Sequence, residues 1–212
     1  MLNLAFGIVV GAILYLGKRK GMNYGTNVNG TKRTVARGRV QLAAMRNLPV
    51  ADLLKNQNVI AFLALIRQGE VGTTGDSGYR VVNGGCTFEG DAYPYKSASL
   101  SAARKFCPCP KTKPNCDRTT ASGAYQFTFA TWNMVSAEGK LKSFDKANQD
   151  AGAVVYLAGL GALGYVMTGL TISAIKASAT LAGWSSMPGG KEPRWTMEQA
   201  LQFYKKSGGK VA

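Results

Sequence analysis

Glu70 is the acidic residue whose sequence neighbours best suit acid–base chemistry. It follows an apolar segment, Asn58–Gly69, and precedes a glycine-rich loop over residues 71–78. A carboxyl group at the C-terminus of an apolar helix meets the negative end of the helix dipole, so its protonated form is favoured. Such an acid can donate a proton to a glycosidic oxygen near neutral pH. The structural alternative is a solvated glutamate at a helix end.

The chain contains no histidine. This excludes nucleophile systems built on Ser-His-Asp or Cys-His, and the usual catalytic zinc sites. Acid–base chemistry must therefore rest on Asp, Glu, Lys, Tyr or Cys. We expect no metal and no cofactor.

The elements that must position Glu70 are mostly helical. Apolar residues at helical spacing predict a helix over 58–69 with Asn58 as its N-cap. Tyr79–Val82 reads as a strand that returns through Thr87-Phe88 to make a small hairpin. Helical patterns resume near residue 127, and a last helix is expected over 196–207. The predicted class is α+β, helix-dominated, with a small β-hairpin lobe.

The N-terminal part of the chain differs from the rest. Residues 2–17 are uncharged and mostly apolar, and Lys18-Arg19-Lys20 follow them. The basic cluster lies after the apolar run, which favours an uncleaved membrane anchor over a signal peptide. We predict an anchor with its basic flank over 1–20, a basic linker over 21–50, and a catalytic domain over 51–212.

The net charge of +15 is concentrated at the N-terminus, where residues 1–50 hold eight Lys or Arg and no acidic residue. Such a block attracts polyanions, which include nucleic acid, anionic lipid and anionic cell-wall polymers. No RNA-binding or helix-turn-helix signature accompanies it, so no specific nucleic-acid partner is predicted.

Residues 151–175 carry no charge and are long enough for a transmembrane helix. The glycines at 159, 161, 164 and 169 disfavour one continuous helix. We therefore expect two buried helices joined by a turn.

The four cysteines are Cys86, Cys107, Cys109 and Cys116. Their spacing does not match a common zinc site, so two disulfides are favoured over zinc or free thiols. The open pairings are Cys86–Cys107 with Cys109–Cys116, or Cys86–Cys109 with Cys107–Cys116. Disulfides would place the domain outside the cytoplasm.

Several short blocks occur in an order typical of one enzyme family. The blocks are Glu70–Thr73, Gly78–Gly85, Ser122–Phe127 and Trp184–Gly189, with Phe144, Gln149-Asp150-Ala151 and Gly161-Ala162-Leu163 between them. Over residues 58–209 the chain resembles the lambda-type endolysins, lytic transglycosylases of glycoside hydrolase family 104. No single block is specific, and their joint order carries the resemblance.

The resemblance implies a two-lobed lysozyme-like fold with Glu70 as the catalytic acid and base. In that family one glutamate protonates the leaving oxygen and then deprotonates the muramic acid O6 hydroxyl, which closes a 1,6-anhydro ring. The remaining residues that we expect to contact the glycan are Tyr79, Asp91, Ser122, Tyr125, Gln126 and Trp132.

The segment after the hairpin departs from the family pattern, because it is shorter and lacks a histidine, which leaves the role of Asp91 open. If Asp91 faced Glu70 across a water molecule, the enzyme would be a hydrolytic muramidase. The favoured hypothesis is a transglycosylase in a phage virion membrane that acts on the host periplasmic cell wall, with virion proteins as possible partners of the N-terminal segment. A non-enzymatic alternative is a basic, membrane-anchored structural virion protein with an inactive lysozyme-like domain.

Overall fold

The computed structural model describes residues 48–112, 118–180 and 183–212. The predicted anchor over 1–20, almost all of the predicted linker over 21–50, and Cys116 lie outside these residues. The predictions for these parts of the chain therefore stay predictions.

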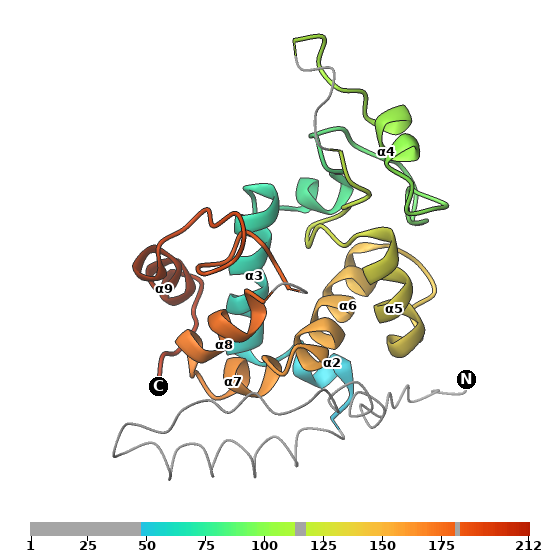
Figure 1. The fold of residues 1–212 in the computed structure, drawn as a ribbon. Helices are drawn as coiled ribbons and strands as arrows, with labels where there is room; N and C mark the ends of the chain where they lie inside the picture. The colour runs from blue at the N-terminus through green and yellow to red at the C-terminus, as the bar shows by residue number, and fades with distance from the viewer. Residues whose placement is uncertain (1–47, 113–117, 181–182) are drawn as a thin grey trace, which may run out of the picture.

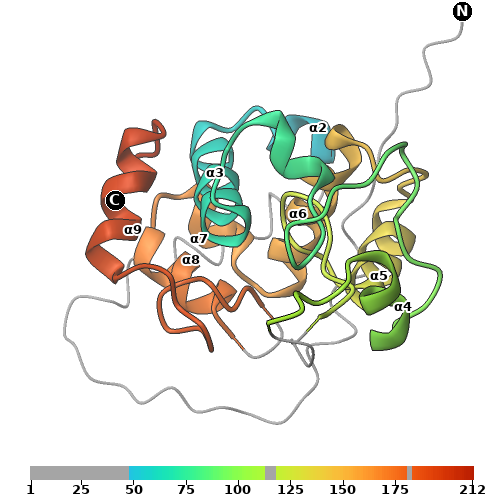
Figure 2. The same ribbon diagram turned by 90° about the horizontal axis from the view of Figure 1, so that it is seen from above.

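The described residues form a mostly helical molecule, as the sequence predicted. The helices are α2 (Val50–Leu53), α3 (Gln57–Val71), the 3-10 helix η2 (Asp76–Arg80), α4 (Leu100–Phe106), α5 (Phe129–Gly139), α6 (Lys146–Gly159), α7 (Leu163–Met167), α8 (Thr171–Ser178) and α9 (Met197–Lys206). Helix α3 packs against α6, α7 and α9, and α5 packs against α6. Both views place α9 on one side of α3 and α6 on the other, while the segment that carries α4 projects from this helical body (Figures 1 and 2).

The N-cap of helix α3 lies two residues before the predicted one. Asn56 is the N-cap, and its side chain accepts hydrogen bonds from the backbone N–H groups of Asn58 (2.9 Å) and Val59 (3.3 Å). The Asn58 side chain instead joins distant segments, donating to the Met167 carbonyl and accepting from the Lys210 N–H. The prediction of Asn58 as the cap was therefore wrong, because tertiary contacts use its amide.

The predicted hairpin survives only as isolated bridges within the described residues. Residues 76–80 form η2, so the strand predicted from Tyr79 was wrong at its start. The remaining pairing consists of single antiparallel bridges, Val81 with Thr87 and Val82 with Ser122. The side chain of Tyr79 explains the change, because its hydroxyl bonds to Asp150 on α6 and holds this turn against the helical body.

A disulfide joins this small lobe to α4. Cys86 pairs with Cys107, whose backbone N–H caps the C-terminus of α4. This confirms one predicted pairing and rules out zinc ligation and free thiols for these two residues. Within the described residues no cysteine is free. The predicted pairing of Cys116 lies outside the described residues. Helix α4 was not predicted, because the sequence around it suggested an irregular loop.

The uncharged stretch 151–175 is divided among three helices. It comprises the rest of α6, the short α7 and most of α8, with a turn over 160–162. This confirms the expected break and adds a second one between α7 and α8. Among the described residues, no helix is long and apolar enough to cross a membrane.

The last predicted helix, over 196–207, is confirmed as α9. Thr196 and Gln199 form a capping box, in which each side chain accepts a hydrogen bond from the other's backbone N–H. The buried residues of α9, Ala200 and Tyr204, face α3, where Tyr204 meets Phe62 edge to face.

Candidate active site

Glu70 lies in the last turn of α3, where its carboxylate meets the hydroxyl of Ser186. The Ser186 Oγ donates a hydrogen bond of 2.5 Å to Oε1 of Glu70. Burial raises the pKa of Glu70, whereas the Ser186 hydrogen bonds and the positive charge of Arg194 oppose this rise. The net direction is upward. The surroundings of Glu70 therefore favour its protonated form, while the Ser186 hydroxyl can donate a hydrogen bond to the carboxylate when the proton is lost.

The approach of Ser186 depends on the absence of a side chain at position 69. A Cβ atom on Gly69 would lie 2.8 Å from the Ser186 Oγ and 3.3 Å from Nε1 of Trp195. A larger residue at position 69 would therefore force the Ser186 hydroxyl to move from this position. Gly69 thus allows the segment to reach Glu70.

A cluster of four polar side chains lies one helical turn before Glu70. Asp150 Oδ1 accepts hydrogen bonds from the hydroxyls of Tyr79 (2.6 Å) and Tyr125 (2.5 Å). The Arg67 guanidinium donates to the Tyr125 hydroxyl at 2.9 Å and lies 3.6 Å from Asp150. The side chains of Arg67 and Asp150 are only 14% and 22% exposed. This ion pair is therefore largely removed from water.

The cluster fixes the direction of both tyrosine rings. Burial, reinforced by the Asp150 charge, raises the pKa of Tyr79 and of Tyr125, so both hydroxyls remain neutral donors. The Arg67 guanidinium lies 5.7 Å from the centre of the Tyr79 ring and 5.9 Å from that of Tyr125. Since Arg67 shares α3 with Glu70, the cluster ties the helix that carries Glu70 to η2 and α6.

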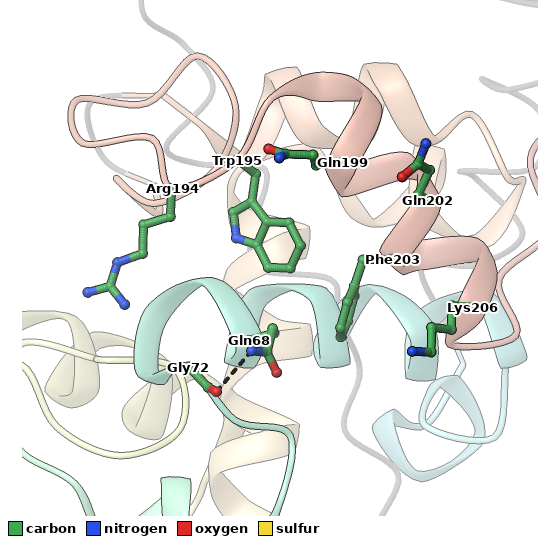
Figure 3. Close-up of a pocket in the computed structure, with 8 residues that line it drawn as sticks. All are labelled: Gln68, Gly72, Arg194, Trp195, Gln199, Gln202, Phe203 and Lys206. Atoms are coloured by element: carbon green, nitrogen blue, oxygen red, sulfur yellow. Dashed lines mark hydrogen bonds between the residues drawn. The ribbon is translucent and has the colours of Figure 1, made fainter.

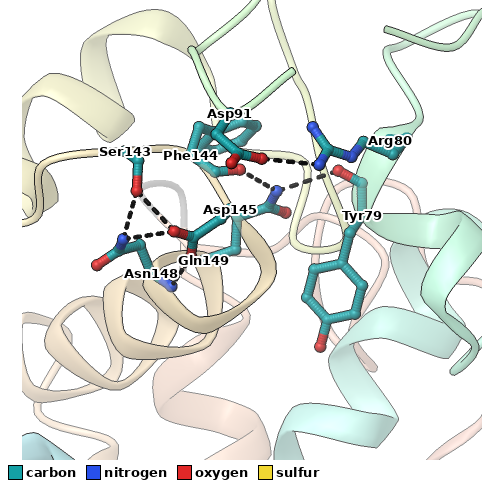
Figure 4. Close-up of polar contacts among 8 residues, drawn as sticks. All are labelled: Tyr79, Arg80, Asp91, Ser143, Phe144, Asp145, Asn148 and Gln149. Carbon is teal, nitrogen blue, oxygen red and sulfur yellow. Dashed lines mark hydrogen bonds and ion pairs between the residues drawn. The ribbon is translucent and has the colours of Figure 1, made fainter. Parts of the chain in front are cut away.

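The side chain of Gln149, near the start of α6, also holds η2 against α6, through hydrogen bonds to backbone groups (Figure 4). Its Nε2 donates to the carbonyls of Tyr79 (3.0 Å) and Phe144 (2.8 Å), and its Oε1 accepts from the Ala124 N–H. A Cβ atom on Gly123 would lie 2.1 Å from this Oε1, and Gly123 has a φ of 73°. A glycine is therefore needed where the 122–127 loop meets Gln149.

Comparison with known proteins identifies the group to which this arrangement belongs. The model of the Endolysin family matches residues 60–211. The chain belongs to the endolysin family.

Two solved structures with the same fold are both lysozyme of bacteriophage lambda. The first, a complex with a chitohexasaccharide, has a TM-score of 0.59 and 26% sequence identity. The match covers 74% of this chain and 97% of the lysozyme chain. The second has a TM-score of 0.56 and 25% identity, with the same coverage. No curated protein sequence matches the chain.

In this endolysin, Tyr125 and Gln126 line a hollow of about 470 Å³ together with Thr131, Tyr156 and Trp184. Gln126 has a φ of 47°, a left-handed backbone conformation that is uncommon for a residue other than glycine. Its side chain donates to the carbonyls of Gly123 (2.9 Å) and Val81 (3.3 Å). The amide oxygen of Gln126 makes no hydrogen bond within the described residues, which leaves it available to a ligand.

The structure does not bring all the predicted glycan-contacting residues together. Asp91 is exposed and pairs with Arg80 at 2.8 Å (Figure 4). Ser122 is 0% exposed and donates to the Thr120 carbonyl. Trp132 packs in the aromatic core, with its ring centre 4.6 Å from that of Phe144. Burial leaves Ser122 and Trp132 little surface to offer a sugar, and Tyr79 and Tyr125, at 4% and 0% exposure, are equally buried.

Sequence reasoning gave no role to Arg67, Asp150 or Ser186. Arg67 carried a usable signal, because it is the one basic residue of α3 and lies three residues before Glu70. Asp150 and Ser186 lie in the sequence blocks that carry the family resemblance. Their partners are 71 and 116 residues away, and no local pattern shows such contacts.

Proposed function

We propose that this endolysin-family protein is a peptidoglycan lytic transglycosylase and that Glu70 is its catalytic acid and base. The carrying observation is the half-buried Glu70 carboxyl, with its pKa raised by burial, in contact with the Ser186 hydroxyl. The substrate class is supported by the matching lysozyme of bacteriophage lambda, whose structure holds a chitohexasaccharide.

The proposed reaction needs one carboxyl group and no water nucleophile. Glu70 gives its proton to the glycosidic oxygen as the bond between muramic acid C1 and that oxygen breaks. The resulting carboxylate takes the proton of the C6 hydroxyl of the same muramic acid, whose oxygen bonds to C1. Glu70 ends protonated and the product carries a 1,6-anhydro ring. The Ser186 hydroxyl stabilises the carboxylate that exists between the two proton transfers.

The surroundings of Asp91 and Asp150 favour this reaction over hydrolysis, because both carboxylates are engaged by other side chains. A hydrolytic muramidase would need a second carboxylate to activate water or to attack C1. Asp91 is held by Arg80, and the charged groups that act most strongly on Glu70 are Arg194 and Glu192. Asp150 already accepts hydrogen bonds from two tyrosine hydroxyls.

We also propose that residues 2–17 anchor the enzyme in a membrane, which we place in a phage virion. An uncharged, mostly apolar run followed by Lys18-Arg19-Lys20 supports the anchor. Flotation of the full chain with anionic lipid vesicles, compared with a chain that lacks residues 2–17, tests it. Equal flotation of both chains would contradict the anchor, and absence of the protein from purified particles would contradict the virion location.

A clearing assay tests the proposed enzyme activity. Purified Gram-negative peptidoglycan is incubated with the full chain, with Glu70→Gln, or with the matched control Glu138→Gln on α5. We expect the wild type and Glu138→Gln to clear the suspension, and Glu70→Gln to lose at least about a hundredfold in rate. Equal clearing by Glu70→Gln and wild type would contradict catalysis by Glu70.

A further inference from the structure

A groove of about 610 Å³ lies between α3 and α9, where the proposed reaction uses no residue. Its lining combines aromatic rings, primary amides and cations, namely Gln68, Gly72, Arg194, Trp195, Gln199, Gln202, Phe203 and Lys206. Figure 3 shows the two aromatic rings between the helices, Arg194 beside the end of α3, and Lys206 towards the other end of the groove.

The aromatic rings give the groove an apolar surface. Trp195 and Phe203 meet edge to face, with their ring centres 5.2 Å apart. Both are only partly buried, so part of each ring remains open to a ligand. The Trp195 indole N–H has no hydrogen-bond acceptor within the described residues. A ligand with apolar faces and hydrogen-bonding edges fits this surface.

Neither cation of the groove is held in a close ion pair, although the charge of Arg194 acts on the Glu70 carboxyl. Among the residues that the structure describes, neither the guanidinium of Arg194 nor the ammonium of Lys206 forms an ion pair or a side-chain hydrogen bond. Gln199 uses its amide oxygen in the capping box of α9, which leaves its amide donors available. Gln68 and Gln202 each already donate one hydrogen bond, to the Gly72 carbonyl and to Glu198, and each keeps a second amide hydrogen. The groove is therefore suited to a ligand with carboxylates and with amide or hydroxyl groups.

The groove is continuous with the active site through one segment of chain. The Arg194 N–H donates to the Ser186 carbonyl at 3.0 Å, and the Ser186 hydroxyl binds Glu70. The neighbouring Trp195 lies close to Gly69, the residue before Glu70. The groove and Glu70 are therefore neighbours at the end of α3, joined by the segment that carries Ser186, Arg194 and Trp195.

We propose that this groove is a second binding site for peptidoglycan, which holds an anionic, N-acetylated glycan strand outside the position of bond cleavage. The inference rests on the proposed function and assigns it a further substrate contact. The rings pack on sugar faces, the amides bind acetamido and hydroxyl groups, and Arg194 and Lys206 bind carboxylates of the lactyl groups and stem peptides. The site would retain the enzyme on the polymer between cleavage events.

The test compares binding of two charge-reversed variants to insoluble peptidoglycan. Lys206→Glu changes a residue of the groove, and Lys205→Glu makes the same charge change on the adjacent residue of α9, which does not line it. Both are prepared as full chains in a Glu70→Gln background, so that the polymer is not consumed. We expect Lys206→Glu to bind at least about fivefold more weakly than Lys205→Glu at low ionic strength. Equal binding by the two variants would overturn the proposal.

Two further comparisons test the role of the aromatic ring and distinguish failure of the groove proposal from failure of the proposed function. Trp195→Ala should weaken binding by at least about threefold and Trp195→Phe should largely restore it, because the aromatic face is retained. Equal binding by both would contradict the stacking role. With Glu70 intact, the control Lys205→Glu, which lies outside the groove, should cleave a short soluble muropeptide as fast as wild type. Failure of wild type to cleave any peptidoglycan would reject the proposed function, whereas the binding comparison would still decide on the groove.

Discussion

Ser186 donates a hydrogen bond to Glu70 across 116 residues of sequence, from the 183–195 segment to the last turn of α3. This contact and burial act in opposite directions on the carboxyl group. Burial favours the neutral acid, and the hydroxyl favours the carboxylate. The balance suits a residue that must first donate a proton and then accept one.

Removing the Ser186 hydroxyl should shift the pH dependence of activity. The hydrogen bond lowers the pKa of Glu70, so Ser186→Ala should raise it further. The alkaline limb of the pH–rate profile reports loss of the Glu70 proton and should move to higher pH. Ser185→Ala is the matched control, because the Ser185 hydroxyl makes no hydrogen bond within the described residues. A shift of the limb to lower pH would contradict the assigned role.

Glu70 should reduce the stability of the fold at neutral pH. Its folded-state pKa lies above its unfolded value, so the folded state binds the proton more tightly. The free energy of unfolding therefore falls as pH rises from the unfolded pKa, about 4.3, through the folded pKa. Glu70→Gln does not suffer this loss and should be more stable than wild type at pH 7. Urea unfolding at several pH values measures the difference, which should vanish below about pH 4. A less stable variant at pH 7 would contradict this account.

The ion pair between Arg67 and Asp150 should contribute more to the free energy of unfolding than an exposed ion pair does. Asp150→Asn retains an oxygen for the tyrosine hydroxyls but leaves the Arg67 cation without a counter-charge. Because this pair is largely buried, we expect a loss of about 3 kcal/mol in unfolding free energy. Asp76→Asn breaks the exposed pair with Lys146 and should cost less than about 0.5 kcal/mol. Chemical denaturation of both variants measures the two losses. Equal losses of unfolding free energy would contradict the account.

The Cys86–Cys107 disulfide should stabilise the hairpin lobe against unfolding. It closes a loop of 21 residues, so replacing both cysteines by serine should cost about 3 kcal/mol. Mass spectrometry of the non-reduced, digested protein should recover a peptide pair joined through Cys86 and Cys107. A pair that joins Cys86 to Cys109 instead would contradict the observed connectivity.

The parts of the fold that depend on local patterns could be predicted from the sequence. The apolar spacing and the glycine-rich loop located Glu70 at the end of a helix, because both features are contiguous. The capping pair Thr196 and Gln199 likewise marks the start of α9 within four residues. The glycines that interrupt 151–175 indicated the break between α6 and α7.

The parts that depend on distant contacts could not be predicted in this way. Tyr79–Val82 reads as a strand in the sequence, but the hydroxyl of Tyr79 bonds to Asp150 on α6 and the residue lies in η2. Trp132 looked able to line a cleft, yet its position on α5 places it against Phe144. The same limit hid Ser186, because only the folded chain brings it to Glu70.

The most direct test of the central claim is mass spectrometry of the soluble muropeptides that the full chain releases from Gram-negative peptidoglycan. Wild type and Glu70→Gln are compared under identical conditions. The account predicts products about 18 Da lighter than hydrolysis products, which identifies 1,6-anhydro ends, and no such products from Glu70→Gln. Products with free reducing ends from wild type would contradict transglycosylation, and anhydro products from Glu70→Gln would contradict catalysis by Glu70.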